Sequence, residues 1–142
     1  ILISHPETSN LGELRSDFPG GWDGDAVNAF SGDGLTEQQL EAQQFVRKLL
    51  NWRKNNAVAQ HGKLMHFAPV KNIYAYFSYD EEDTIMFVLN RYEQAVTLDT
   101  DRFAERIGGA THGTDVVTGE RFNIEESLVL KPRSALLLEL ED

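Results

Sequence analysis

The chain has 142 residues, of which 41% are hydrophobic and 25% are charged, so its size and composition suit one ordinary globular domain. The net charge of −10 repels phosphate backbones, so nucleic acid is not an expected partner, and no apolar run of about eighteen residues is present that would span a membrane. The absence of cysteine excludes disulfide and thiolate chemistry but does not identify a compartment.

The first segment, residues 1–35, reads as irregular and is punctuated by glycine and proline. Its start, "ILISHPET", lacks the basic residues and apolar core of a signal peptide, so we expect a processed or excised piece whose targeting segment lies elsewhere. The letters "ILIS" are compatible with the end of a buried strand. A loop of about 30 residues is unusual in a compact domain unless it is functional or belongs to something larger.

The stretch "LRSDFPGGWDGDAVNAFSGDG", residues 14–34, combines groups that could bind a sugar. Arg15 offers two parallel donors to a carboxylate or to hydroxyls, and Phe18 and Trp22 offer flat apolar faces to sugar rings. The alternative is a structural loop, in which Arg15 pairs with Asp17 or another carboxylate and Trp22 fills a gap. The letters "DGDAVN" resemble the start of a calcium loop, but their spacing favours an ordinary turn.

Residues 36–56 predict a helix. Thr36 and Gln39 have the spacing of a capping box at its start. One side of this helix is apolar at spacings of three and four residues, and we expect that side to be buried. It comprises Ala42, Phe45, Val46, Leu49, Leu50 and Arg53.

The remaining sequence predicts an antiparallel β-sandwich of seven or eight short strands, with Greek-key connections. The expected strands are "KLMHF", "IYAYFSY", "TIMFVLN", "AVTLD", "DVVTG", "RFNI", "SLVLK" and "ALLLEL". Residues 73–79 and 85–89 are apolar on both faces, which favours the middle of a covered sheet. Residues 80–83 predict a solvated hairpin turn, and residues 100–109 a short helix that ends at Gly108.

Catalytic chemistry has no local signature in the sequence. The histidines His5, His61, His66 and His112 are scattered without ligand spacing, and no zinc-protease, serine-hydrolase or phosphate-loop motif occurs. Carboxylates are abundant, but nothing in the sequence places two of them in one cleft for glycoside hydrolysis. We therefore expect no catalytic residue, no metal site and no cofactor in this chain.

A family resemblance is carried by "LRSDFPGGW", by "LLNWRK" followed by "GKL", and by "DVVTGERFNIEESLVLKPRSALLLELE". With these motifs the chain resembles the C-terminal part of an α-amylase-family glycoside hydrolase of the cyclomaltodextrinase and neopullulanase type. The resemblance implies that residues 1–57 are the end of a catalytic (β/α)8 barrel, with a loop after its eighth strand and its eighth helix. It also implies that residues 58–142 are the C-terminal β-sandwich.

The same resemblance implies that Arg15, Asp17 and Trp22 stand at the rim of a cleft for an α-glucan substrate, because such barrels build their active sites from these loops. The catalytic carboxylates of the family lie on earlier barrel strands, so this chain alone would be structural. The parent would cleave α-1,4 glucosidic bonds in a bacterial cytoplasm or periplasm, two compartments that the sequence does not distinguish.

Two other functions stay open on the residues alone. The sandwich could be a glucan-binding module that uses Tyr74, Tyr76, Tyr79 and Tyr92, although packing in the core and hairpins is the ordinary explanation for tyrosines at these positions. Alternatively, the apolar side of residues 36–56 could mediate interaction, for example as a homodimer.

Overall fold

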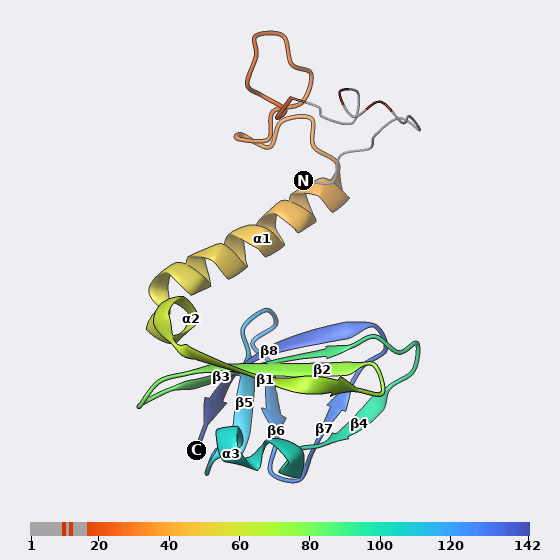
Figure 1. The fold of residues 1–142 in the computed structure, drawn as a ribbon. Helices are drawn as coiled ribbons and strands as arrows, with labels where there is room; N and C mark the ends of the chain where they lie inside the picture. Colours follow the sequence, from red (N-terminus) through yellow and green to blue (C-terminus); the bar gives the residue numbers. More distant parts are fainter. Residues whose placement is uncertain (1–9, 11, 13–16) are drawn as a thin grey trace. The chain divides into compact units, whose positions relative to one another are not determined.

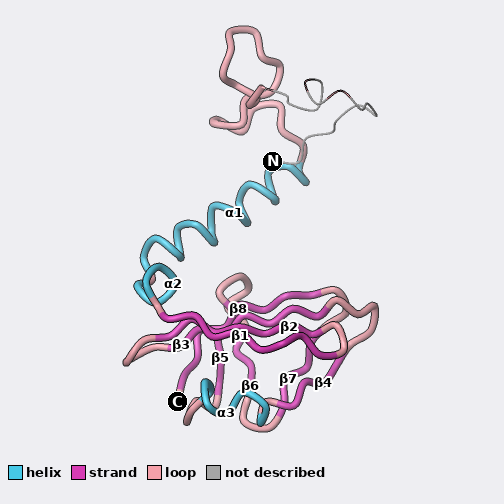
Figure 2. The backbone as a smooth tube through the Cα atoms, viewed as in Figure 1, coloured by secondary structure: helices cyan, strands magenta, loops and turns pink. Residues whose placement is uncertain are grey.

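A computed structural model of the chain describes residues 10, 12 and 17–142. The chain forms two compact units, Ile1–Lys48 and Leu49–Asp142, which are described separately below. The start of the first segment, including "ILIS" and Arg15, lies outside the described residues. Figure 1 shows the order of the elements along the chain, and Figure 2 shows that strands dominate its C-terminal part.

Helix α1, Glu37–Asn55, confirms the helix expected at residues 36–56. Its capping box is formed: the Gln39 amide N–H donates to Thr36 Oγ1 over 3.3 Å, and the Thr36 N–H donates to Gln39 Oε1 over 2.9 Å. None of the helix residues is buried within this chain, so the burial expected for the apolar side stays a prediction. Phe45 is 49% exposed and Leu50 is 62% exposed.

A second helix, α2 (Ala57–His61), follows directly and was not expected from the sequence. Asn56 is its N-cap, and its side-chain oxygen accepts from the Ala59 N–H over 2.8 Å. At Gly62 the chain turns into the first strand. A Cβ atom there would lie 2.5 Å from the Val58 carbonyl oxygen and 2.6 Å from Ser78 Oγ, so only glycine fits.

The sandwich confirms the predicted fold class, which is mainly β and antiparallel. Six strands form one sheet in the order β1-β2-β3-β8-β5-β6, and two strands, β4 and β7, form the other (Figure 1). The strands are β1 Lys63–Val70, β2 Ile73–Tyr79, β3 Thr84–Asn90, β4 Val96–Asp99, β5 His112–Asp115, β6 Arg121–Asn123, β7 Ser127–Leu130 and β8 Ser134–Glu141.

Most of the expected strands match these elements, and one does not. A strand was expected at residues 115–119, but β5 ends at Asp115 and a turn follows. The Asp115 carboxylate accepts from the N–H and the hydroxyl of Thr118, over 2.9 and 2.7 Å, and thereby closes the turn. Gly119 completes it with a φ of 75°. The polar turn chemistry thus outweighs the β propensity of the two valines.

The short helical segment expected at residues 100–109 is present as η1, Asp101–Phe103, followed by α3, Ala104–Ile107, with Gly108 at its C-cap. It contributes Phe103 and Ile107 to the core, which lies between the two sheets. The largest fully buried side chains there come from both layers, such as Phe77 and Met86 from one sheet and Leu128 from the other. Burial of this kind is the main source of stability for a sandwich.

Candidate functional site

The loop at residues 17–35 has a defined conformation, which hydrogen bonds from its own polar side chains stabilise. Asp25 Oδ2 accepts from the Gly20 N–H over 2.8 Å and from the Trp22 N–H over 3.2 Å. The Asp25 carboxylate therefore accepts hydrogen bonds from the backbone of its own loop, which supports the prediction that "DGDAVN" is a turn. Asn28 Oδ1 accepts from the Phe30 N–H over 2.9 Å and organises the next turn in the same way.

Glycine is required at position 20, where the two turns approach each other. Gly20 has a φ of +94°, and a Cβ atom there would lie 2.6 Å from Asn28 Oδ1 and 2.9 Å from the Asn28 Cα. The loop is also tied to its helix, because Gln43 Nε2 donates to the carbonyl oxygen of the buried residue Ala29 over 2.5 Å. The helix thus fixes one side of the loop within this unit.

Three aromatic side chains are left exposed by this arrangement. Trp22 is 69% exposed, Phe30 is 73% exposed and Phe18 is 53% exposed. The Phe18 and Phe30 rings contact each other with centroids 5.2 Å apart. Exposed flat rings on an ordered loop suit stacking against the C–H faces of sugars.

Two of the three predicted rim residues, Asp17 and Trp22, lie in the described part of the chain. Trp22 does not fill a gap among the described residues, which argues against the structural alternative for that side chain. Asp17 is exposed and makes no hydrogen bond to a described residue, and Arg15 lies outside the described part. The prediction that these three side chains share one rim therefore stays a prediction. Phe30 was missed as a candidate, although the quoted sequence "VNAF" contains it.

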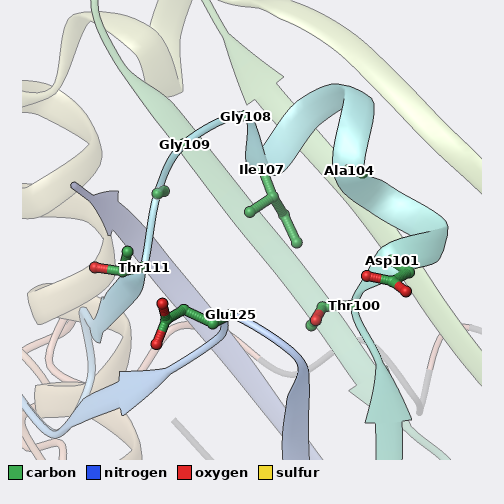
Figure 3. A pocket seen from close by; sticks show the side chains of 9 residues that line it. Thr100, Asp101, Ala104, Ile107, Gly108, Gly109, Thr111 and Glu125 are labelled. Atoms are coloured by element: carbon green, nitrogen blue, oxygen red, sulfur yellow. The ribbon is translucent and has the colours of Figure 1, made fainter.

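The sandwich contains a small polar pocket beside α3 (Figure 3), with a volume of about 300 Å³. Thr111 and Glu125 lie at one end, Thr100 and Asp101 at the other, and Ile107 between them. The hydroxyl of Thr100 is buried and makes no hydrogen bond to any described residue. With two carboxylates and two hydroxyls this pocket can accept hydrogen bonds, but it lacks a third carboxylate or a histidine for a metal site.

The tyrosines of the sandwich mostly pack on other side chains. Tyr76 stacks on Phe87 with ring centroids 4.8 Å apart and contacts Tyr74 at 5.9 Å. Burial in this cluster raises the pKa of the Tyr76 phenol, and the neighbouring Tyr74 raises it further. The guanidinium of Arg106 lies 4.0 Å from the centroid of the Tyr79 ring.

Metal-ligand groups and membrane-spanning helices are both missing from the described ranges. No group of three or more histidine, cysteine, aspartate or glutamate side chains in residues 17–142 is arranged to hold a metal ion. Among the helices that the structure describes, none has the length and apolar character needed to cross a bilayer.

The chain from Leu49 onward is thus an antiparallel β-sandwich that is entered from a helix. Residues 64–139 match the sequence model described as the cyclo-malto-dextrinase C-terminal domain. The chain belongs to this family.

Solved structures support the fold independently. AmyP in complex with maltose superposes with a TM-score of 0.64 at 19% identity, over 81% of this chain and 23% of that chain. A variant of AmyP in complex with maltotriose superposes with a TM-score of 0.62 at 22% identity, over 84% of this chain and 23% of that chain. The trehalulose synthase MutB from Pseudomonas mesoacidophila MX-45 superposes with a TM-score of 0.54 at 16% identity, over 70% of this chain and 18% of that chain. The chain thus spans less than a quarter of the length of these proteins.

Proposed function

We propose that this chain is the C-terminal segment of a hydrolase that degrades maltodextrins or cyclodextrins by cleaving α-1,4 glucosidic bonds. The observation that carries the proposal is the match of residues 64–139 to the cyclo-malto-dextrinase C-terminal domain. In this proposal residues 1–57 complete the catalytic barrel, and residues 58–142 are the sandwich that supports it. AmyP, whose structure was solved with maltose, provides a related precedent for α-glucan binding.

The segment itself is proposed to be structural and non-catalytic. Hydrolysis with retention needs two carboxyl groups about 5 Å apart on either side of the scissile bond. In the described loop, Asp25 accepts from two backbone N–H groups and Asp33 accepts from the Ser31 hydroxyl over 2.7 Å. Both of these carboxylates hold turns within the loop. We assign the catalytic pair to the remainder of the parent, as the family resemblance implies.

The rim of the substrate cleft is proposed to include Trp22, together with Arg15 and Asp17. Support comes from the 69% exposure of Trp22 and from the turn around Asp25 that holds its backbone. The ring of Phe30, 73% exposed, is added to this rim because its backbone is fixed by the adjacent Asn28 turn.

The test compares the purified chain with the complete gene product on maltohexaose and on a cyclodextrin. The proposal predicts that only the complete product releases reducing ends. In that product, Trp22→Ala is expected to raise KM about tenfold, the loss of one aromatic contact of roughly 1.4 kcal/mol. Tyr92→Ala, on the sandwich, is the matched control and should leave KM unchanged. Turnover by the purified chain alone, or no turnover by the complete product, would contradict the proposal.

A further inference from the structure

The chain contains the dipeptide Asp–Gly only twice, and both copies, Asp23–Gly24 and Asp33–Gly34, lie in the loop at residues 17–35. Each copy forms the middle of a turn, 22–25 or 32–35, which a hydrogen bond of 3.3 Å from the last N–H to the first carbonyl oxygen closes. Both glycines have a positive φ, 91° and 73°. The two copies thus share their sequence and their place in a turn, so their surroundings can be compared directly.

An aspartate that precedes glycine can react with the backbone that follows it. The glycine amide nitrogen attacks Cγ of the protonated carboxyl group, because no glycine side chain hinders the approach. The new C–N bond closes a cyclic imide, and the carboxyl hydroxyl leaves with the amide proton as water. When water then opens the ring at the Cα carbonyl, the original peptide bond breaks and the chain continues through the side-chain carbonyl, which makes the residue isoaspartate.

The copy at Asp33–Gly34 is held by its surroundings. Asp33 Oδ2 accepts from the Ser31 hydroxyl over 2.7 Å, and the Asp33 carbonyl oxygen accepts from the Asn28 N–H over 2.8 Å. A Cβ atom at Gly34 would lie 2.5 Å from the Ala26 carbonyl oxygen, so another part of the loop backbone passes close to this turn. The carboxyl group and the main chain must both leave these positions before the ring can close, which requires local opening of the loop.

The copy at Asp23–Gly24 has no such restraints. Asp23 is exposed, and its carboxylate accepts no hydrogen bond from a described residue. Apart from its chain neighbours, Gly24 has no atom within 4 Å of the place where a Cβ atom would lie. The side chain and the main chain can therefore rotate into the attacking geometry while the rest of the loop stays closed.

We propose that Asp23 is a site of spontaneous covalent modification, at which aspartate converts to isoaspartate, and that the fold protects Asp33 from the same reaction. The reaction needs no co-reactant other than water, because the water released on ring closure is balanced by the water that opens the ring. The inference rests on contacts within this loop and does not depend on the proposed function.

The modification acts on Trp22, because isoaspartate adds a methylene group to the main chain of the turn 22–25. The Asp25 N–H donates to the Trp22 carbonyl oxygen over 3.3 Å, and Asp25 Oδ2 accepts from the Trp22 N–H over 3.2 Å. A longer main chain between these two residues cannot keep both hydrogen bonds in this geometry. We therefore expect the Trp22 amide to exchange with solvent about tenfold faster once Asp23 is converted.

The test follows isoaspartate at the two positions while the purified chain is stored in mildly acidic buffer, either folded or in concentrated urea. Digestion with an endoproteinase that cleaves before aspartate, but not before isoaspartate, reads each position separately. In the folded chain we expect Asp23 to convert about tenfold faster than Asp33, since only Asp33 needs local opening. In urea, where the restraints are absent, both positions should convert at nearly the same rate.

A matched pair of variants gives a second readout, the total isoaspartate of the folded chain. Asp23→Glu should remove most of it, because the same attack on a glutamate needs a larger ring, whereas Asp33→Glu should change the total little. Equal conversion of the two positions in the folded chain would overturn the inference. A difference that persists in urea would overturn it too, because the neighbouring residues and not the fold would then set the rates. Unchanged exchange of the Trp22 amide in the converted protein would refute the effect on the turn.

Discussion

Glu139 is the side chain by which the sandwich holds the helical segment, and its removal should release that segment. Its Oε1 atom accepts from Trp52 Nε1 over 2.7 Å and from Asn56 Nδ2 over 2.9 Å. A hydrogen bond to a charged group contributes about 1.5–3 kcal/mol. Because Glu139 is only half-buried and water can replace part of this contribution, we expect Glu139→Ala to cost about 2 kcal/mol in total. This corresponds to roughly a 30-fold increase in local opening.

The assay uses the fluorescence of Trp52. The only other tryptophan is Trp22, so a Trp22→Phe background leaves Trp52 as the single reporter. In urea, Glu139→Ala should move the Trp52 transition to lower denaturant, whereas Glu139→Gln, which keeps an acceptor, should show a smaller shift. Glu126→Ala is the control, because that side chain is exposed. Identical Trp52 transitions in Glu139→Ala and in the control would refute the reasoning.

Three further predictions concern the sandwich. Asn90 is fully buried and its Nδ2 donates to two loop carbonyls over 2.8 and 3.0 Å, so Asn90→Ala should lower the free energy of unfolding by about 3 kcal/mol in urea titrations. Gly62→Ala should lower the thermal midpoint by several degrees in calorimetry, because its Cβ atom would lie 2.5 Å from the Val58 carbonyl oxygen; an unchanged midpoint would contradict the geometry. Folding raises the pKa of Tyr76 above its ordinary value of 10.0, so the neutral phenol is favoured in the folded state, and the associated stability is present below pH 10 and lost as pH rises through the folded pKa. Tyr76→Phe should therefore flatten the decline of stability above pH 10, and an unaltered decline would assign it to other groups.

Much of the fold could be predicted because its signals are local. The capping box of Thr36 and Gln39 marks the start of α1 within one turn, and the apolar runs of β2 and β3 coincide with residues 73–79 and 84–90. Helix α2 was missed because its five residues carry no helical period, and its Asn56 cap is recognisable only when the chain is seen to turn at Gly62.

The burial of the helix could not be predicted, since it depends on what lies opposite and not on the helix sequence. The spacing of Phe45, Val46 and Leu50 correctly identifies one apolar side, yet these side chains are 47–62% exposed in this chain. For a similar reason, the candidate site could be predicted only in part from the sequence. The exposure of Trp22 depends on the turn that Asp25 closes, and neither residue type alone distinguishes a rim residue from a core residue.

The mass of the native protein that carries this sandwich tests the central claim most directly. An antibody raised against residues 58–142 would detect it in a blot of the source cells. The account predicts a band several times larger than the 16.0 kDa of this chain, because the rest of a glucan hydrolase would be joined to its N-terminal side. A single native band at 16.0 kDa would contradict the account and would show that the cell uses the loop, the helix and the sandwich by themselves.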